Sequence, residues 1–142
     1  MDLALAEARA AAEAGEVPVG CVIVRNDGVL AKAFNRTIMD RDPTAHAEMI
    51  ALRAAAAALG SERLVDCDLY VTLEPCTMCT AAISFARIRT LYYGATDPKG
   101  GAVASGVRFF ASPTCHHRPD VQAGLGAEAA ATLLKDFFRA RR

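Results

Sequence analysis

The chain has 142 residues, a length typical of one domain, and 53% of them are hydrophobic, which is enough to bury a core. Sixteen basic and sixteen acidic residues cancel, so the net charge indicates no class of partner. No cationic segment precedes an apolar one at the N-terminus, and the apolar run 54–59 is too short to cross a bilayer. Without an export signal, five cysteines favour metal binding over disulfides. We therefore expect one domain over residues 1–142, acting in the cytoplasm and away from membranes.

The secondary structure can be predicted from hydrophobic periodicity and from Gly, Pro, Asn and Asp at the expected ends of elements. The turn Asn26-Asp27-Gly28 predicts a hairpin, and Asp42-Pro43 predicts a capped helix start. In chain order we expect helix 2–14, strands 17–25 and 29–35, helix 43–59, strand 68–73, helix 75–86, strand 89–94, a Gly-rich loop 97–106, a short fifth strand 107–110, irregular chain 111–125 and helix 128–139.

The order of these elements indicates the fold class. Strands that alternate with helices pair in parallel through right-handed crossovers, whereas the hairpin adds an antiparallel pair. We expect an α/β fold, a three-layer αβα sandwich with a five-stranded mixed sheet and helices on both faces.

Two short stretches contain the residues of a metal centre: His46-Ala47-Glu48 and Pro75-Cys76-Thr77-Met78-Cys79. One imidazole and two thiolates are three zinc ligands. A catalytic zinc has three protein ligands and an open position, whereas a structural zinc usually has four. Both stretches are expected at helix N-termini, where the helix dipole favours thiolate over thiol. The sequence thus predicts one Zn²⁺ per chain, with His46, Cys76 and Cys79 as ligands.

Glu48 follows the histidine by two residues, so its carboxylate can exchange protons with a water at the open position. Zinc lowers the pKa of a bound water to about 7, which supplies a hydroxide nucleophile at neutral pH, and Glu48 is then its proton shuttle. The spacing of these residues resembles that of the zinc nucleobase deaminases, and this resemblance implies that the hydroxide attacks an amine-bearing ring carbon in a hydrolytic deamination. A closed structural zinc is the alternative, with Cys67, Cys115 or His116 as fourth ligand, but it leaves Glu48 without a task.

The spacing of these motifs matches the zinc nucleobase deaminases. Further stretches extend the match along the chain, and through them it resembles the cytidine deaminase-like superfamily and, within it, the bacterial tRNA adenosine deaminases. Those enzymes convert the wobble adenosine of a tRNA anticodon to inosine. The stretches are Glu16-Val17-Pro18-Val19-Gly20, Asn35-Arg36, residues 42–48, residues 69–76, Gly94-Ala95 with Asp97 and Lys99, and Asp136-Phe137-Phe138-Arg139.

The resemblance implies substrate contacts that the residue types alone do not establish. It implies that Asn35 and Val19 contact the target base, although Asn35 could only shape a turn and Val19 could be core. It also implies that Asp97 and Lys99 contact the RNA backbone or the nucleotides beside the flipped base, although Asp-Pro-Lys-Gly-Gly is typical of a plain turn. The other implied contacts, to the anticodon stem-loop, are Phe137, Phe138 and Arg139. Of the two phenylalanines we expect at least one to be buried. The resemblance further implies a homodimer.

Some residues depart from the family pattern, and other functions stay open. Thr37 stands where the tRNA branch often has proline, and Cys115-His116-His117 is either local variation or a minor extra metal site. A deaminase of free guanine, cytosine or a nucleoside would need the same zinc site without a basic surface. A zinc-stabilised RNA-binding module would need no catalysis.

Overall fold

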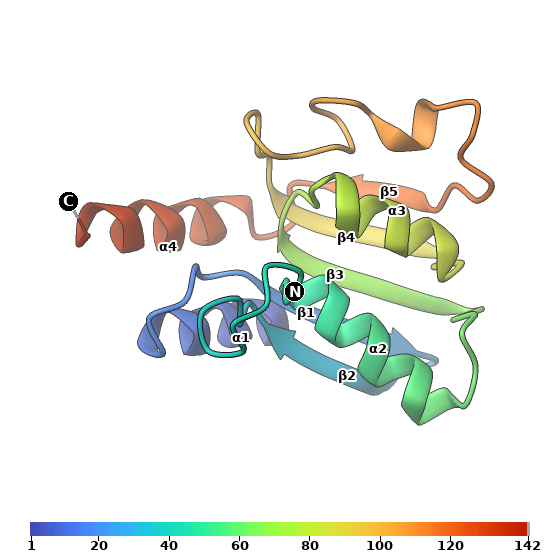
Figure 1. Cartoon of the computed structure of the whole chain (residues 1–142), viewed down its shortest axis with the longest axis horizontal. Helices are drawn as coiled ribbons and strands as arrows, with labels where there is room; N and C mark the ends of the chain where they lie inside the picture. Colours follow the sequence, from blue (N-terminus) through green and yellow to red (C-terminus); the bar gives the residue numbers. More distant parts are fainter. Residues whose placement is uncertain (142) are drawn as a thin grey trace.

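A five-stranded mixed sheet forms the middle layer of the structure, a computed structural model that describes residues 1–141 (Figure 1). The strand order is β2-β1-β3-β4-β5. Strand β1 pairs antiparallel with β2 and β3, whereas β3, β4 and β5 run parallel. The elements are α1 (Asp2–Glu13), β1 (Gly20–Arg25), β2 (Gly28–Phe34), α2 (Ala47–Leu59), β3 (Cys67–Leu73), α3 (Thr77–Phe85), β4 (Thr90–Ala95), a 3-10 turn (Phe109–Ala111), β5 (Asp120–Ala123) and α4 (Ala127–Arg139).

Helices cover both faces of the sheet, which confirms the predicted αβα sandwich. Helices α2 and α3 contact each other on one face, and α1 and α4 contact each other on the opposite face (Figure 1). Side chains of a strand alternate between the two faces. On β1, Cys21 and Ile23 therefore join the main core with the buried side of α2, while Val22 faces α1.

The N-terminal helix packs directly on the start of β1. Gly20 permits this approach, because a Cβ at that position would lie 2.6 Å from the backbone nitrogen of Ala8 and would also strike the carbonyl oxygen of Ala4. The result is that residues 16–20 are held against α1, and they lead the chain into the region of the candidate site. None of the helices in the described part of the chain is long and apolar enough to cross a membrane.

Two predicted elements differ most from the structure, the fifth strand and the start of α2, and β1 also starts later than predicted, at Gly20. The fifth strand is Asp120–Ala123, and 107–110 ends instead in the 3-10 turn. All four residues of β5 are exposed at the edge of the sheet, so their burial imposes no apolar alternation that the sequence could reveal.

The second wrong boundary is the start of α2, which begins at Ala47 and not at Pro43. The Asp42 carboxylate accepts hydrogen bonds from the Thr44 amide (2.8 Å) and the Thr44 hydroxyl (2.7 Å). Asp42 therefore closes a local turn instead of capping the helix, and His46 becomes the N-cap residue with extended backbone angles.

Candidate functional site

The three predicted metal ligands lie together between the first turns of α2 and α3. The Nδ1 atom of His46 is 3.6 Å from the Cys76 Sγ and 3.5 Å from the Cys79 Sγ. His46 and Cys76 are the N-cap residues of their helices, and Cys79 is in the first turn of α3. The two helix starts thus place one nitrogen and two sulfurs within 4.8 Å of one another.

This donor set fits a tetrahedral zinc ion. With Zn–S of about 2.3 Å and Zn–N of about 2.0 Å, tetrahedral ligands are separated by about 3.6 Å from nitrogen to sulfur. Within residues 1–141, no further His, Cys, Asp or Glu belongs to the group. The alternative of a closed structural site, with Cys67, Cys115 or His116 as fourth ligand, is therefore wrong.

Proton sharing among the three ligands prepares the site for a cation. The hydrogen bond from the Cys79 thiol, together with that from His46, outweighs burial and lowers the pKa of the Cys76 thiol to about 4. The same pairing raises the pKa of the Cys79 thiol, and Cys76 raises the pKa of the His46 imidazole. Because metal binding displaces ligand protons, a thiolate that already exists at neutral pH favours a divalent cation here.

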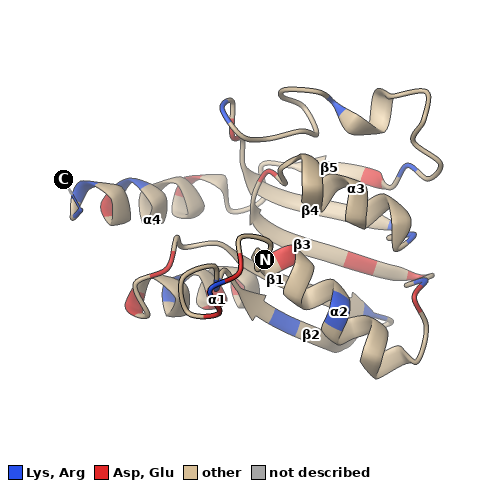
Figure 2. Ribbon diagram, in the orientation of Figure 1, with Lys and Arg blue, Asp and Glu red and all other residues tan. Residues whose placement is uncertain are grey.

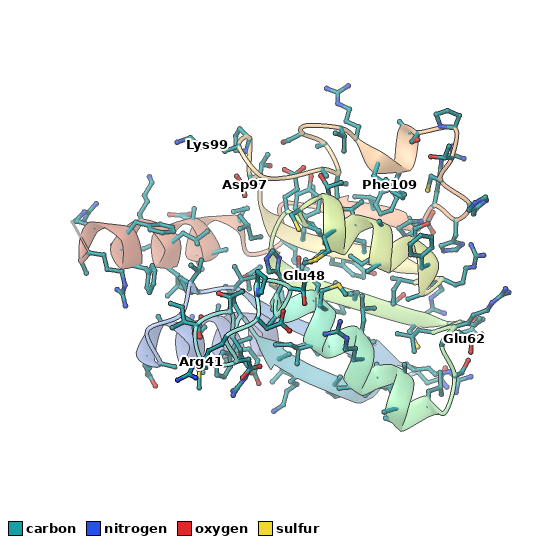
Figure 3. All side chains as sticks on the ribbon, in the orientation of Figure 1. Arg41, Glu48, Glu62, Asp97, Lys99 and Phe109 are labelled. Atoms are coloured by element: carbon teal, nitrogen blue, oxygen red, sulfur yellow. The ribbon has the colours of Figure 1, made fainter. Side chains whose placement is uncertain are left out.

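Glu48 lies beside these ligands, in the first turn of α2, with its side chain only 4% exposed (Figure 3). Burial raises the pKa of its carboxyl above the ordinary value. A carboxyl group whose pKa moves toward neutrality can both accept and return a proton, as a general acid–base requires. Glu48 is thus close to the three metal ligands without belonging to their group, and its role as proton shuttle stays a prediction.

A cavity of about 340 Å³ opens at the metal ligands. Its walls contain Val19, Asn35, Asp97, Gly100, Glu48 and Cys76. This volume is in the range of small-molecule sites and accepts one flat heterocycle. Four residues that the sequence analysis assigned to catalysis or to substrate contact therefore share one cavity: Val19, Asn35, Glu48 and Asp97.

Asn35 is fixed in this cavity by a buried acid that the sequence analysis did not single out for a role. The Glu16 side chain is fully buried and accepts hydrogen bonds from the backbone amides of Met39 (2.7 Å) and Ile38 (3.3 Å). The Nδ2 of Asn35 also points at Glu16, at 3.5 Å. Asn35 keeps its Oδ1 and a second N–H for a ligand, so it can both accept and donate.

The other predicted contact residues lie outside the cavity. Lys99 is exposed at the tip of the loop that carries Asp97 (Figure 3). Phe137 on α4 is buried and Phe138 is about half exposed, as expected for at least one of them. Arg139 is exposed at the end of α4, where Figure 2 shows basic residues gathered.

Cys115 and His117 do not form an extra metal site. The Cys115 thiol contacts the Ser84 hydroxyl at 3.5 Å, and the His117 Nε2 lies 2.7 Å from the Ile88 carbonyl oxygen. These contacts tie residues 115–117 to the end of α3, which is a structural role. The alternative of local variation is therefore the one that the structure supports.

Comparisons with known proteins agree with this geometry. The family described as "Cytidine and deoxycytidylate deaminase zinc-binding region" matches residues 1–95. A tRNA-specific adenosine deaminase of Agrobacterium fabrum is 63% identical over 142 residues, covering 100% of this chain and 93% of the relative. The chain belongs to the tRNA-specific adenosine deaminase family. It is thus a zinc-dependent hydrolytic deaminase with one zinc site per chain.

Solved structures of this superfamily show the same fold. One from a study of A-to-I editing by tRNA:A34 deaminases at the wobble position of transfer RNA has a TM-score of 0.93 and 63% identity, covering 94% of this chain and 97% of that one. A guanine deaminase from Bacillus subtilis has a TM-score of 0.66 and 33% identity, covering 99% of this chain and 90% of that one. The family fold therefore accommodates more than one purine substrate.

Proposed function

We propose that this deaminase converts adenosine to inosine at the wobble position of a tRNA anticodon. The observation that carries the proposal is the group of three metal ligands beside the buried Glu48, at a cavity sized for one base. The 63% identity over the whole chain to a tRNA-specific adenosine deaminase supports the choice of substrate. A loop nucleotide is a sensible target, because extruding an unpaired base costs only a few kcal/mol.

The chemistry divides between the metal and the side chains of the cavity. Zinc held by His46, Cys76 and Cys79 supplies a Lewis acid that makes water acidic enough to lose a proton near neutral pH. The Glu48 carboxylate accepts that proton and delivers it to the purine ring nitrogen next to the carbon under attack. Glu48 then accepts the remaining proton of the hydroxyl group now bonded to the ring carbon and passes it to the amine. The carbon–nitrogen bond breaks, ammonia leaves, the oxygen stays as the carbonyl of inosine, and Glu48 is again a carboxylate.

Asn35 and Val19 hold the base in register with Glu48. The Asn35 amide is 7% exposed and faces the cavity, where it hydrogen-bonds an edge of the purine. Val19 is 9% exposed and packs against the flat face of the ring. Together, these two contacts orient the base so that its amine-bearing carbon faces Glu48 and the three metal ligands.

Residues around the cavity hold the rest of the anticodon loop. Asp97 and Lys99 lie at the mouth, where they contact the nucleotides beside the extruded base. Phe138 offers an exposed ring on which a neighbouring base stacks, and Arg139 meets a phosphate. Phe137 supports this surface from below, because it is buried and its ring lies 5.3 Å from that of Phe138.

The enzyme acts as a homodimer through the outer surface of α2 and α3. An apolar groove of about 300 Å³ runs between these helices, and Phe85 stands beside it with 67% of its surface exposed. Met49, Leu52 and Ala82 line the same groove. Exposed apolar patches of this kind mark protein interfaces. We expect Phe85→Glu to give monomers in analytical ultracentrifugation. Val107→Glu, at an exposed valine outside the groove, is the control and should leave the dimer intact. A dimeric Phe85→Glu protein would contradict this interface.

Free bases are the second candidate substrate, because the Bacillus subtilis guanine deaminase shares the fold at 33% identity. The enzyme should be incubated with an anticodon stem-loop that has adenosine at the wobble position and, separately, with guanine and cytosine. We expect inosine in the RNA and no ammonia from the free bases. Ammonia from guanine without inosine in the RNA would favour the second candidate, and binding of the stem-loop without ammonia would favour an RNA-binding module.

Because the proposed substrate is a tRNA, we also propose that the enzyme acts in the cytoplasm.

A further inference from the structure

Glu74, the residue after β3, has a carboxylate that the mechanism does not use. Its side chain is only 2% exposed and lies in the wall of the cavity. Its backbone N–H donates to the Ala95 carbonyl at 2.8 Å, which ties it to the end of β4. Glu74 therefore lies between the segment that leads to Cys76 and the loop that carries Asp97 and Lys99.

Five donors of that loop converge on this one carboxylate. Oε1 accepts hydrogen bonds from the Asp97 amide and the Ser105 hydroxyl, each at 2.9 Å. Oε2 accepts bonds from the backbone amides of Val103 (3.1 Å), Ala104 (2.9 Å) and Ser105 (2.9 Å). A carboxylate offers about four lone-pair sites, so these donors leave Glu74 no capacity to serve a bound base.

The loop is shaped to receive this side chain. A Cβ on Gly101 would lie 2.6 Å from both the Glu74 Oε1 and the Asp97 carbonyl oxygen, so glycine lets the loop backbone close around this carboxylate. The Ala102 amide donates to the Pro75 carbonyl at 2.9 Å, which fastens the same loop to the residue before Cys76. Within the loop, the Asp97 carboxylate accepts bonds from the amides of Lys99 and Gly100.

We infer that Glu74 is a positioning residue that holds the Asp97–Ser105 loop at the mouth of the cavity and so sets the affinity for the RNA. The inference rests on the proposed function, because it assigns Asp97 and Lys99 to substrate contact. Glu74 acts through these residues, because both of its carboxylate oxygens accept hydrogen bonds from the loop. We call the five hydrogen bonds from the loop to the Glu74 carboxylate the clamp. Loss of the clamp therefore weakens substrate binding more than it slows the chemical step.

Glu74→Gln tests this inference, because the amide keeps the shape but replaces one acceptor oxygen with a donor. We expect KM for the anticodon stem-loop to rise roughly tenfold, which corresponds to about 1.4 kcal/mol of binding free energy, while kcat and zinc content stay near wild type. Hydrogen exchange at the amides of Val103, Ala104 and Ser105 should accelerate. Glu13→Gln, at an exposed glutamate of α1 that lines neither the cavity nor the groove between α2 and α3, is the matched control and should change neither quantity.

Two further variants change the loop residues that contact Glu74 and leave Glu74 itself unchanged. Gly101→Ala keeps Glu74 but places a Cβ against its carboxylate and against the Asp97 carbonyl oxygen, so it should also raise KM and accelerate exchange, even if Glu74→Gln does not fold. Ser105→Ala removes one of the five bonds and should give a smaller change in the same direction.

Unchanged exchange at residues 103–105 in Glu74→Gln, or a loss of kcat or zinc at constant KM, would overturn the inference. The exchange measurement needs no RNA, so it remains decisive even if wild-type enzyme forms no inosine. That latter result would refute the proposed function alone.

Discussion

The substitution Glu16→Gln tests whether the buried carboxylate of Glu16 holds Asn35 and the 35–39 segment in place, without changing any residue at the metal. The carboxylate of Glu16 is fully buried, with Oε2 on the Met39 amide and Oε1 on the Ile38 amide and the Asn35 Nδ2. A glutamine oxygen can replace only one of these two oxygens, and its NH₂ group then faces a backbone N–H. At least one charge-assisted hydrogen bond is lost, and such a bond contributes about 2 kcal/mol.

This loss should appear in stability and in catalysis together. For a domain of this size, about 2 kcal/mol lowers Tm by roughly 6 °C. Because Asn35 loses the acceptor that orients its amide, kcat/KM for the stem-loop should fall roughly tenfold, which is the effect of about 1.4 kcal/mol on transition-state binding.

Differential scanning calorimetry and steady-state inosine formation provide the two measurements, with metal analysis to show that zinc is retained. Glu13→Gln, at an exposed glutamate of α1 three residues earlier, is the matched control. An unchanged Tm would show that the buried carboxylate does not hold the 35–39 segment. A lower Tm with an unchanged kcat/KM would show that the orientation of Asn35 does not matter for the base.

Three further outcomes follow from the structure. Phe137→Ala should lower the free energy of unfolding by about 3 kcal/mol in denaturant, because its ring is buried. Phe138→Ala should leave that free energy unchanged and weaken stem-loop binding roughly tenfold. Equal losses of stability in the two variants would contradict this division. Gly20→Ala should lower Tm sharply because its Cβ would strike α1, and a wild-type Tm would show that the helix can shift at little cost. Removing zinc with a chelator should abolish deamination and lower Tm, both of which added zinc restores; activity that survives in metal-free protein would contradict a zinc-dependent mechanism.

The metal centre was accessible to sequence reasoning because its geometry is local. His46 and Glu48 are two residues apart, and Cys76 and Cys79 three, so each pair is brought together by a single helix start. The sheet only has to bring the two helix starts side by side, and the alternation of strands and helices predicts that much. The αβα sandwich was predicted for the same reason.

The supports of the cavity were not predicted because they depend on the tertiary structure. Glutamates are usually exposed, so the sequence alone predicts Glu16 and Glu74 at the surface. Only the folded chain shows that backbone amides of the 38–39 and 97–105 segments donate to their carboxylates. No periodic pattern marks such a buried acceptor. A hint was present in Gly101, since a glycine within a loop can indicate close backbone approach, but the partner it makes room for is far away in sequence.

Edge and surface features were hard to predict for a different reason. Strand β5 buries none of its four side chains, so its identity comes from backbone pairing with β4 alone. Phe137 and Phe138 have the same side chain and differ only in their surroundings in the folded chain: Phe137 is buried, with the Arg141 guanidinium carbon 3.5 Å from its ring centroid, whereas Phe138 is about half exposed. The substrate contacts proposed for Asp97, Lys99, Phe138 and Arg139 stay predictions.

Glu48, the proton shuttle beside the three metal ligands, is the residue on which the proposed mechanism depends most. The most direct test measures zinc content and inosine formation on the same preparation of Glu48→Ala, with the anticodon stem-loop as substrate. We expect zinc to stay near one per chain while the rate falls at least a hundredfold, which is in the range of about 10²–10⁴ for loss of a general acid–base. A zinc-loaded Glu48→Ala protein that forms inosine at the wild-type rate would contradict the mechanism.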